Sequence, residues 1–393
     1  MNLKVLNTDI QAFINSHLDS DIHSLLLSHE TIEGIPTQVI VEQIEAKRKC
    51  KEKLPTWFKT KGIYYPNKLN IEQTSSEIAA YYKAKLVSGN RLIDLTGGLG
   101  VDSYYFAKTT PEVIHIEQNP HLSEIAEYNA KQLNVNNIDF ISSNGIEVLK
   151  NSEEYFDWIY IDPSRRHDVK GKVFFLKDCE PNVPQHLDLL FEKADQIMIK
   201  TAPLLDISAG LSELKHVETI HIVAIKNELK EVLWILNKEN TKKITVHAVN
   251  ITNKEQDHFQ FDLSSEASAK VSYSEPKTYL YEPNVAIYKS GAFKSISERF
   301  NLCKLHPNSH LYTSNELIDF PGRRFKIESV LPYQKKILKK NLPNKANLTT
   351  RNFPENVQVL RKKFSIKDGG NTYLFFTTSI ENNKIVVLCS KVE

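Results

Sequence analysis

The sequence predicts an α/β fold with a mainly parallel sheet, because short apolar runs alternate with helical patterns along its middle part. The runs at 92–95, 113–116, 138–141 and 158–161 have the length of buried strands, and polar or acidic residues follow each of them. Crossovers between parallel strands place helices on both faces of such a sheet. The predicted architecture is therefore Rossmann-like, with a ligand crevice beyond the carboxyl ends of its strands.

A glycine-rich turn follows the first predicted strand. Residues 91–100 read RLIDLTGGLG, with Asp94 near the end of the strand and glycines at 97, 98 and 100. Glycines allow the backbone to approach a ligand closely, which side chains at these positions would prevent. A short helix is predicted directly after the turn, over residues 101–108.

The next strands also end at polar groups. Glu117 ends the second strand 17 residues after Gly100, a spacing at which a carboxylate can accept both hydroxyl groups of a ribose. The third strand leads to Asn144, and the fourth leads to the sequence DPSRR at 162–166. We expect these groups to face one common crevice.

Two nucleoside-containing ligands could occupy this crevice. A dinucleotide requires G-x-G-x-x-G and a helix N-terminus for its pyrophosphate, and the glycines at 97, 98 and 100 match that spacing poorly. S-adenosylmethionine (SAM) has no phosphate; it needs close backbone beneath its methionine part and a carboxylate at its ribose. The pattern of Asp94, Gly98, Gly100 and Glu117 fits SAM better.

Over residues 71–250 the chain resembles the class I SAM-dependent methyltransferases, which implies SAM as cofactor and a seven-stranded Rossmann-like sheet. A strand at 196–200, one at about 217–225, and antiparallel strands at 231–236 and 244–251 would complete that sheet, with further edge hairpin in 252–278. The resemblance implies that SAM is bound by Asp94, Thr96, Gly97, Gly98, Gly100, Asp102, Glu117, Gln118, Asn144 and Asp162.

Two of these positions depart from the usual pattern. Thr96 stands where many members have the first glycine of the motif. Asn144 stands where many have an aspartate that contacts adenine; the change keeps a carbonyl acceptor but loses the charge. Asp162-Pro163 resembles the fourth motif, at the rim of the substrate pocket, although DPSRR differs from the usual Asp/Asn-Pro-Pro form.

A closer resemblance covers most of the chain. It is carried by DLTGGLGVD (94–102), IDPSRR (161–166), DCEP (178–181), YLYEPNVAIYKSGAF (279–293), FPGRRF (320–325) and KDGGNTYLF (367–375). These motifs are similar to those of a bacterial family of RNA-methyltransferase-like proteins, whose members carry ferredoxin-like and THUMP-like modules after the catalytic domain. THUMP modules are associated with RNA-modifying enzymes, so this resemblance implies RNA (tRNA or rRNA) as the partner.

The expected domains are a helical region at 1–70, a SAM-dependent methyltransferase domain at 71–278, a ferredoxin-like module at 279–322 and a THUMP-like module at 323–393. Thr74 and Glu77 have the spacing of a capping box, which predicts that Thr74 caps the helix leading to the first strand. Gly322 is predicted to be a hinge between the two small modules.

Composition is that of an ordinary globular protein, with 41% hydrophobic and 25% charged residues among 393. No run approaches the ~20 apolar residues that a membrane span requires. The N-terminus lacks the basic and apolar regions of a secretion signal, so a cytoplasmic location is expected. The four cysteines are scattered without C-x-x-C spacing, and we expect neither disulfides nor a metal site.

Charge is distributed unevenly along the chain. The net charge is only +2, but residues 323–393 hold 15 Lys and Arg against 5 Asp and Glu. The rest of the chain is therefore acidic. A basic module on an acidic body is typical of proteins that bind nucleic-acid phosphates, although a lysine-rich solvated surface would give the same pattern.

The predicted reaction is methyl transfer from SAM to a base in RNA. Asp162 would orient the acceptor or accept its proton, and the predicted catalytic residues are Asp162, Pro163, Ser164 and Arg165. Arg165 and Arg166 are predicted to bind the substrate through phosphate or by stacking on a base. Cys179 is a weaker candidate nucleophile, because the adjacent Asp178 and Glu180 would raise the pKa of its thiol.

Two alternatives remain open at this point. The chain could methylate a small molecule or a protein, with a basic end that serves only solubility. It could also be a non-catalytic RNA-binding protein on a methyltransferase-like fold, which Asn144 and the unusual fourth motif would permit. The combination of Asp94, Glu117 and Asp162 argues against lost activity.

Overall fold

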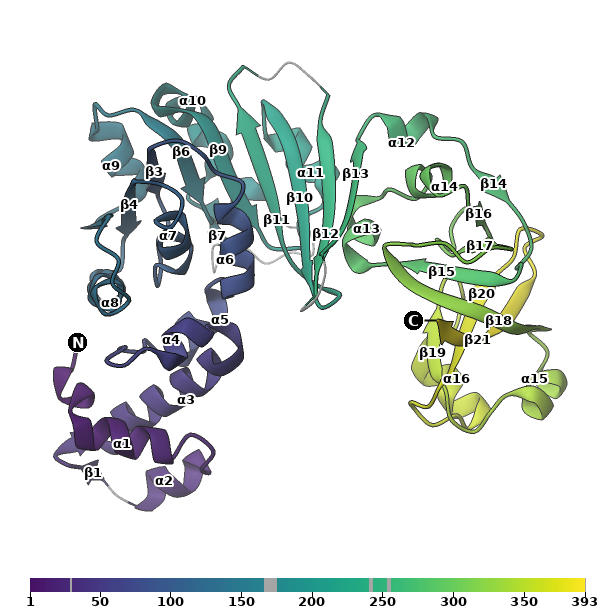
Figure 1. Ribbon diagram of the computed structural model, residues 1–393, viewed down its shortest axis with the longest axis horizontal. Helices are drawn as coiled ribbons and strands as arrows, with labels where there is room; N and C mark the ends of the chain where they lie inside the picture. Colours follow the sequence, from purple (N-terminus) through teal and green to yellow (C-terminus); the bar gives the residue numbers. More distant parts are fainter. Residues whose placement is uncertain (29, 166–174, 240–242, 253–255, 393) are drawn as a thin grey trace. The chain divides into compact units, whose positions relative to one another are not determined.

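The structure, a computed structural model, describes residues 1–28, 30–165, 175–239, 243–252 and 256–392 (Figure 1). The chain forms two compact units, one with residues 1–218 and 232–241 and the other with residues 219–231 and 242–393. It passes between them within strands β10 (Val217–Ile225) and β11 (Glu228–Asn237).

The first unit begins with a helical region, as predicted. Buried apolar side chains such as Ile10, Ile44 and Trp57 form its core. Its elements are the 3-10 helix η1 (Leu3–Leu6), α1 (Thr8–Ser16), α2 (Ile22–Ser28), β1 (Thr31–Ile32), β2 (Ile35–Pro36), α3 (Thr37–Lys53), α4 (Pro55–Lys59), α5 (Lys68–Gln73) and α6 (Glu77–Ala84).

The predicted capping box at the start of α6 is wrong. Thr74 ends α5, and Ser76 caps α6 by accepting a hydrogen bond from the backbone N–H of Ala79. The Glu77 carboxylate instead accepts hydrogen bonds from the backbone N–H and the hydroxyl group of Thr56. The Glu77 carboxylate thus bonds to Thr56 of α4 and not to the backbone at the start of its own helix.

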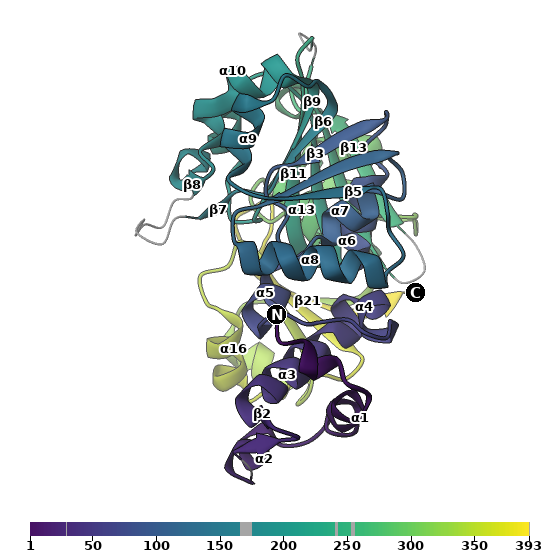
Figure 2. The same cartoon turned by 90° about the vertical axis from the view of Figure 1, so that its left-hand side faces the viewer.

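An α/β layer follows. Its elements are β3 (Arg91–Asp94), α7 (Val101–Phe106), β4 (Glu112–Glu117), α8 (Pro120–Gln132), β5 (Ile138–Ser142), α9 (Gly145–Asn151), β6 (Phe156–Ile161), β7 (Ser164–Arg165), the 3-10 helix η2 (Leu176–Asp178), β8 (Cys179–Glu180), α10 (Val183–Lys193), β9 (Ala194–Thr201) and α11 (Ile207–Glu213). Strands β5, β4, β3, β6 and β9 pair in parallel in that order. Helices α7 and α8 cover one face of this sheet, and α9 and α10 cover the other (Figures 1 and 2). The Rossmann-like architecture is confirmed.

Beyond β9 the strand directions differ in part from the prediction. Strand β11 pairs antiparallel to β9, as expected. Strand β12 (Thr245–Ile251), however, runs parallel to β10, so the predicted antiparallel orientation of 244–251 is wrong; its antiparallel partner is β13 (Gln256–Asp262). An apolar run has the same pattern in either direction, so its orientation depends on the connection rather than on its residues.

The strand order of this sheet is β13-β12-β10-β11-β9-β6-β3-β4-β5. In the described part of the chain the sheet therefore has nine strands where seven were expected. Strand β12 lies in the predicted strand 244–251, and β13 lies in the stretch 252–278 where further edge hairpin was expected.

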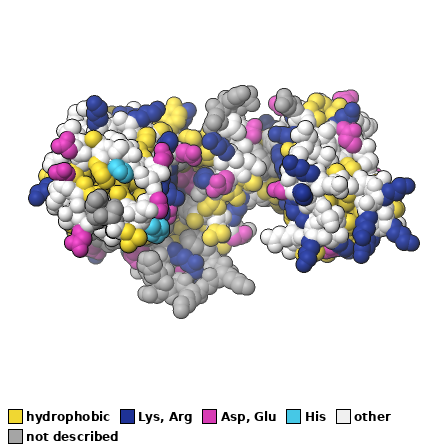
Figure 3. Space-filling model, turned by 90° about the horizontal axis from the view of Figure 1, so that it is seen from below, with side chains coloured by type: hydrophobic (Ala, Val, Ile, Leu, Met, Phe, Trp, Pro, Cys, Tyr) yellow, Lys and Arg dark blue, Asp and Glu magenta, His cyan; other side chains and the backbone are white. Residues whose placement is uncertain are grey.

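The C-terminal part of the second unit is built on one sheet with the order β14-β16-β17-β15-β18-β21-β20-β19. Its elements are α12 (Ser265–Ser268), β14 (Ser272–Tyr273), β15 (Tyr279–Pro283), α13 (Val285–Ser290), α14 (Ser295–Arg299), β16 (Cys303–Lys304), β17 (Tyr312–Ser314), β18 (Gly322–Pro332), α15 (Lys335–Asn341), β19 (Asn347–Thr350), α16 (Val357–Phe364), β20 (Thr372–Thr378) and β21 (Lys384–Val392). Lysine and arginine side chains gather on this C-terminal part, seen at the right of Figure 3.

Gly322 is not a hinge. It is the first residue of β18 and pairs with Pro283 of β15, and a Cβ atom at this position would lie 2.2 Å from the carbonyl oxygen of Glu282. Leu280 and Leu311 share one core with Phe325 and Phe375 across the predicted module border. The close backbone approach, not flexibility, explains this glycine.

No helix in the described residues is both long and apolar enough to cross a bilayer. The described residues also contain no group of three or more His, Cys, Asp or Glu side chains arranged to hold a metal ion.

Candidate active site

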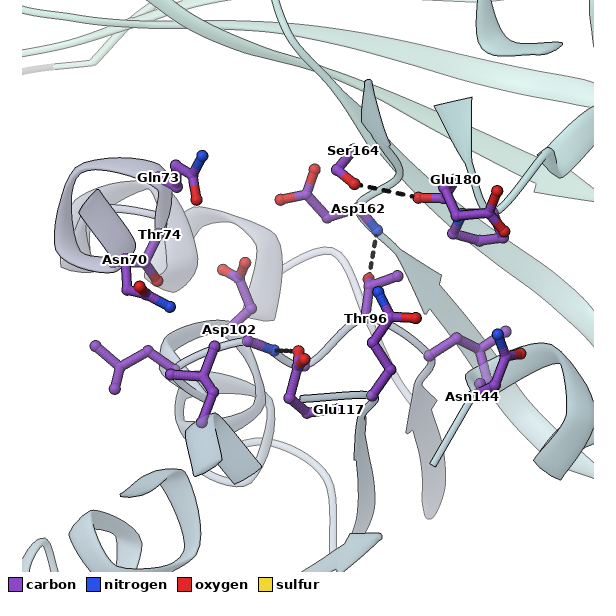
Figure 4. Close-up of a pocket in the computed structure, with 18 of the residues that line it drawn as sticks. Asn70, Gln73, Thr74, Thr96, Asp102, Glu117, Asn144, Asp162, Ser164 and Glu180 are labelled. Atoms are coloured by element: carbon purple, nitrogen blue, oxygen red, sulfur yellow. Dashed lines mark hydrogen bonds between the residues drawn. The ribbon is translucent and has the colours of Figure 1, made fainter. Parts of the chain in front are cut away.

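A cavity of about 300 Å³ lies in the first unit, beyond the carboxyl ends of β3, β4 and β6 (Figure 4). It is lined by Asn70, Gln73, Thr74, Ser75, Leu95, Thr96, Gly97, Gly98, Leu99, Asp102, Glu117, Gln118, Leu122, Asn144, Gly145, Ile146, Asp162, Ser164, Glu180 and Pro181. This volume is at the lower end of the range for cofactor sites.

The glycine-rich turn forms the floor of the cavity. A Cβ atom on Gly97 would lie 2.1 Å from the buried imidazole ring of His115, so only glycine fits there. Gly98 has a φ of +56°, and a Cβ there would meet no atom nearer than 4.0 Å, which leaves bare backbone toward the cavity. Helix α7 begins after Gly100.

Asp94 lies beneath this turn and does not line the cavity. One carboxylate oxygen accepts a hydrogen bond from the backbone N–H of Thr96 (3.0 Å), and the other accepts one from the Ser103 hydroxyl (2.6 Å). The Ser103 oxygen also lies 3.0 Å from Nδ1 of His115. Burial raises the pKa of Asp94 to about 7 and lowers the pKa of His115 to about 3. In this structure Asp94 therefore supports the turn from below.

Glu117 faces the cavity at the end of β4. Its carboxylate accepts hydrogen bonds from the backbone N–H groups of Gly98 (2.9 Å) and Asn119 (2.7 Å). These two contacts hold the side chain in place, and the carboxylate oxygens keep further lone pairs for hydroxyl donors. This geometry fits a carboxylate that accepts hydrogen bonds from a ribose diol.

Asn144 is the N-cap of α9. Its carbonyl oxygen accepts hydrogen bonds from the backbone N–H groups of Ile146 (3.0 Å) and Glu147 (3.2 Å). The expectation that Asn144 offers a carbonyl acceptor to adenine therefore does not match the structure, because helix capping uses that oxygen. The amide NH₂ is the part of the side chain that remains for a ligand.

Asp102, in the first turn of α7, lines the cavity with a buried lysine behind it. Lys83 Nζ lies 2.9 Å from Asp102 Oδ1 and donates a hydrogen bond to the Ser75 hydroxyl (2.7 Å). The hydroxyl groups of Ser75 and Tyr160 donate to Asp102 Oδ2 at 2.8 and 2.9 Å. The Lys83 side chain is 0% exposed and that of Asp102 is 11% exposed. These contacts join α6, α7 and β6 beneath the cavity.

Asp162 follows β6 and also has a lysine behind it. Its backbone N–H donates a hydrogen bond to Thr96 Oγ1 (2.7 Å), and its Oδ2 accepts one from Lys200 Nζ on β9 (2.8 Å). Ser164 lies beside it on β7, which pairs with β8. Both Asp102 and Asp162 thus line the cavity, whereas their lysine partners do not.

The structure brings most of the predicted site residues together. Those that line the cavity are Thr96, Gly97, Gly98, Asp102, Glu117, Gln118, Asn144, Asp162 and Ser164. Those that do not line it are Asp94, Gly100, Pro163 and Arg165. Arg166 lies outside the described residues.

Two segments of the cavity wall were not assigned to the site from the sequence. Asn70, Gln73 and Thr74 come from α5 and the segment after it, and Glu180 and Pro181 come from β8 and the residue after it. Gln73 and Thr74 lie in the segment EQTSSE (72–77), which belongs to the same family resemblance, and Glu180 and Pro181 lie in DCEP (178–181); no such motif includes Asn70.

Cys179 is buried beside this wall, and its sulfur lies 3.6 Å from the carbonyl oxygen of Phe175. Burial, with the nearby Asp178 carboxylate as the second cause, raises the pKa of the thiol to about 11. The nucleophilic thiolate is therefore disfavoured at neutral pH, which argues against a catalytic role.

Comparison with solved structures reveals a relative of the whole chain. The crystal structure of a presumed methyltransferase from Porphyromonas gingivalis W83 is 31% identical in sequence and superposes with a TM-score of 0.90. The match covers 100% of this chain and 99% of that one. The chain belongs to this methyltransferase family.

Two family models match the C-terminal part of this family member. A ferredoxin-like domain matches residues 279–321, and a THUMP-like domain matches residues 322–391. Among curated proteins, an uncharacterized RNA methyltransferase of Mycoplasma mobile is 30% identical over 129 residues. That match covers 32% of this chain and spans about a third, 35%, of the Mycoplasma protein.

Proposed function

We propose that the chain is a SAM-dependent methyltransferase that acts on a base in RNA, either tRNA or rRNA. The observation that carries this proposal is the cavity in which bare backbone at Gly98 lies beside the carboxylates of Glu117, Asp102 and Asp162. SAM supplies an electrophilic methyl group on a sulfonium. A wall rich in carboxylates suits this positively charged cofactor better than it suits a phosphate-bearing dinucleotide.

In this proposal some residues of the cavity bind the cofactor and others align the acceptor. Glu117 accepts hydrogen bonds from the ribose hydroxyl groups, and Asn144 donates its amide N–H toward a ring nitrogen of adenine. Asp102 faces the ammonium group of the cofactor's amino-acid part. Asp162 and Ser164, at the rim, position the acceptor, because alignment for in-line attack is the main catalytic requirement of this reaction. We further propose that residues 71–278 form the catalytic domain.

The modules at 279–322 and 323–393 are proposed to dock the RNA. Residues 329–354 contain no Asp or Glu, and α15 carries four exposed lysines at 335, 336, 339 and 340. Within the described part of the chain these lysines form no ion pair, in contrast to Lys363, which pairs with Glu355. Unpaired lysines on one short helix are suited to the phosphates of a nucleic-acid backbone.

Transfer of labelled methyl groups from SAM to RNA tests the activity. Total RNA from cells that lack the protein should accept label from the wild-type protein, and nucleoside mass analysis should identify one methylated base. Label that enters protein or small molecules but not RNA would instead support the alternative acceptor class. SAM binding without transfer to any acceptor would support the non-catalytic RNA-binding alternative.

Point variants test the docking surface better than a deletion of 323–393, because Leu280 and Phe325 share one core across that border. Replacing the four α15 lysines by glutamine should weaken RNA binding and make its salt dependence shallower. The matched control replaces four exposed lysines elsewhere, at 226, 238, 243 and 270. Equal loss in both variants would show that α15 is no specific docking surface.

A further inference from the structure

The ion pair between Lys200 and Asp162 joins two neighbouring strands at the rim of the cavity. Lys200 is the penultimate residue of β9, and Asp162 directly follows β6, which is parallel to β9. The Nζ atom of Lys200 lies 2.8 Å from Asp162 Oδ2, and the two side chains are 16% and 29% exposed. The pair is thus partly shielded from water, which makes the attraction stronger than that of a surface pair.

This contact fixes Asp162 in a defined orientation. The backbone N–H of Asp162 donates a hydrogen bond to Thr96, so both the main chain and one carboxylate oxygen are held. The Asp162 carboxylate points toward the side of the cavity where Gln73 lies (Figure 4). Because Lys200 does not line the cavity, it can contribute to the site through Asp162 rather than by touching a ligand of the cavity.

We propose that Lys200 is a positioning residue for the methyl acceptor. It holds Oδ2 of Asp162, so that Oδ1 stays directed at the acceptor group that is brought to the rim of the cavity. The inference rests on the proposed methyltransferase function, and it names a residue on β9 that the family motifs do not include. Loss of Lys200 leaves the cofactor wall of Gly98, Asp102 and Glu117 intact.

The Lys200→Met variant should therefore lose turnover but retain affinity for SAM. We expect kcat to fall roughly 10²-fold, the scale expected for a misplaced reacting group, while the calorimetric Kd for SAM stays within about twofold of wild type. Lys200→Arg, which keeps the charge and much of the reach, should recover most of kcat. The control is Lys193→Met, which removes a lysine whose Nζ donates a hydrogen bond to the Ser152 carbonyl outside the cavity.

A double-mutant cycle separates positioning from a general structural effect. If Lys200 acts through Asp162, adding Lys200→Met to Asp162→Asn should lower kcat no further. An equal loss in both backgrounds, or full kcat in Lys200→Met, would overturn the inference. If Lys200→Met does not bind SAM, Lys200→Arg replaces it in the same cycle. Its effect on kcat should then be seen with Asp162 present and should vanish in the Asp162→Asn background. A wild-type protein that transfers no methyl group to RNA would reject the proposed function instead.

Discussion

Replacing Lys83 by methionine should destabilise the first unit strongly. Lys83 is completely buried and lies between Asp102 Oδ1 and the Ser75 hydroxyl, at 2.9 and 2.7 Å. Methionine fills a similar volume but leaves the Asp102 carboxylate, which is 11% exposed, without its cation. Removing one partner of a buried ion pair costs about 3–5 kcal/mol. For a unit of this size the cost corresponds to a fall in melting temperature on the order of 10 °C.

Tryptophan fluorescence measures this unit selectively. All three tryptophans of the chain, Trp57, Trp158 and Trp234, are buried within the first unit. Their emission should therefore shift when this unit unfolds. Urea or thermal unfolding followed at this signal gives the change in stability directly.

The double variant Lys83→Met/Asp102→Asn serves as the control. It removes both charges, and the asparagine carbonyl can still accept hydrogen bonds from Ser75 and Tyr160. We expect it to regain at least half of the stability lost in Lys83→Met. A loss below about 1 kcal/mol in Lys83→Met would contradict the assigned role of the ion pair, since a broken buried pair costs several times more. The assigned role would also be contradicted if Lys83→Met/Asp102→Asn were as unstable as Lys83→Met.

Three further outcomes are expected. Gly97→Ala should abolish SAM binding, because its Cβ would lie 2.1 Å from the His115 ring; unchanged calorimetric affinity would show that this close approach does not constrain the turn. Asn144→Asp should bind SAM several-fold more weakly with unchanged unfolding, because aspartate caps α9 equally well but has no amide N–H to donate to the adenine ring nitrogen; equal or tighter binding would contradict this. Acidification from pH 7 to 5 should destabilise the second unit, because burial lowers the pKa of His221 to about 3 and the pKa of His247 to about 4, so the unfolded chain binds protons that the folded one excludes. For the buried His221 the loss approaches about 1.4 kcal/mol per pH unit below pH 6.5, and the partly exposed His247 contributes less. Amide exchange that stays unchanged in β10 and β12 between pH 7 and 5 would contradict this prediction.

Those parts of the fold that depend on local patterns could be predicted from the sequence. The runs around Asp94, Glu117 and Asp162 are apolar, short and followed by polar residues, and their strands end at one edge as expected. Strand direction could not be obtained in this way. The segment 244–251 has a strand pattern, yet nothing in that pattern distinguishes parallel from antiparallel pairing with β10.

The lysines behind the site illustrate what the sequence conceals. Lys83 occurs in a helical pattern between tyrosine and alanine residues, where a lysine usually faces solvent. Its burial depends on α7 bringing Asp102 against α6, which is a tertiary contact. The same reason explains why Glu77 did not form the predicted capping box, since Thr56 takes its carboxylate.

Calorimetric titration of the wild-type protein and of Glu117→Gln with SAM tests the central claim most directly. Glu117 holds no cation in the described residues, and its carboxylate is kept toward the cavity by two backbone N–H groups. The cavity assignment predicts one SAM per wild-type chain, and a loss of affinity of at least tenfold in the variant, because removing a charged partner of a hydrogen bond costs about 1.5–3 kcal/mol. No heat of binding to the wild type, or equal affinity of the two proteins, would contradict the assignment.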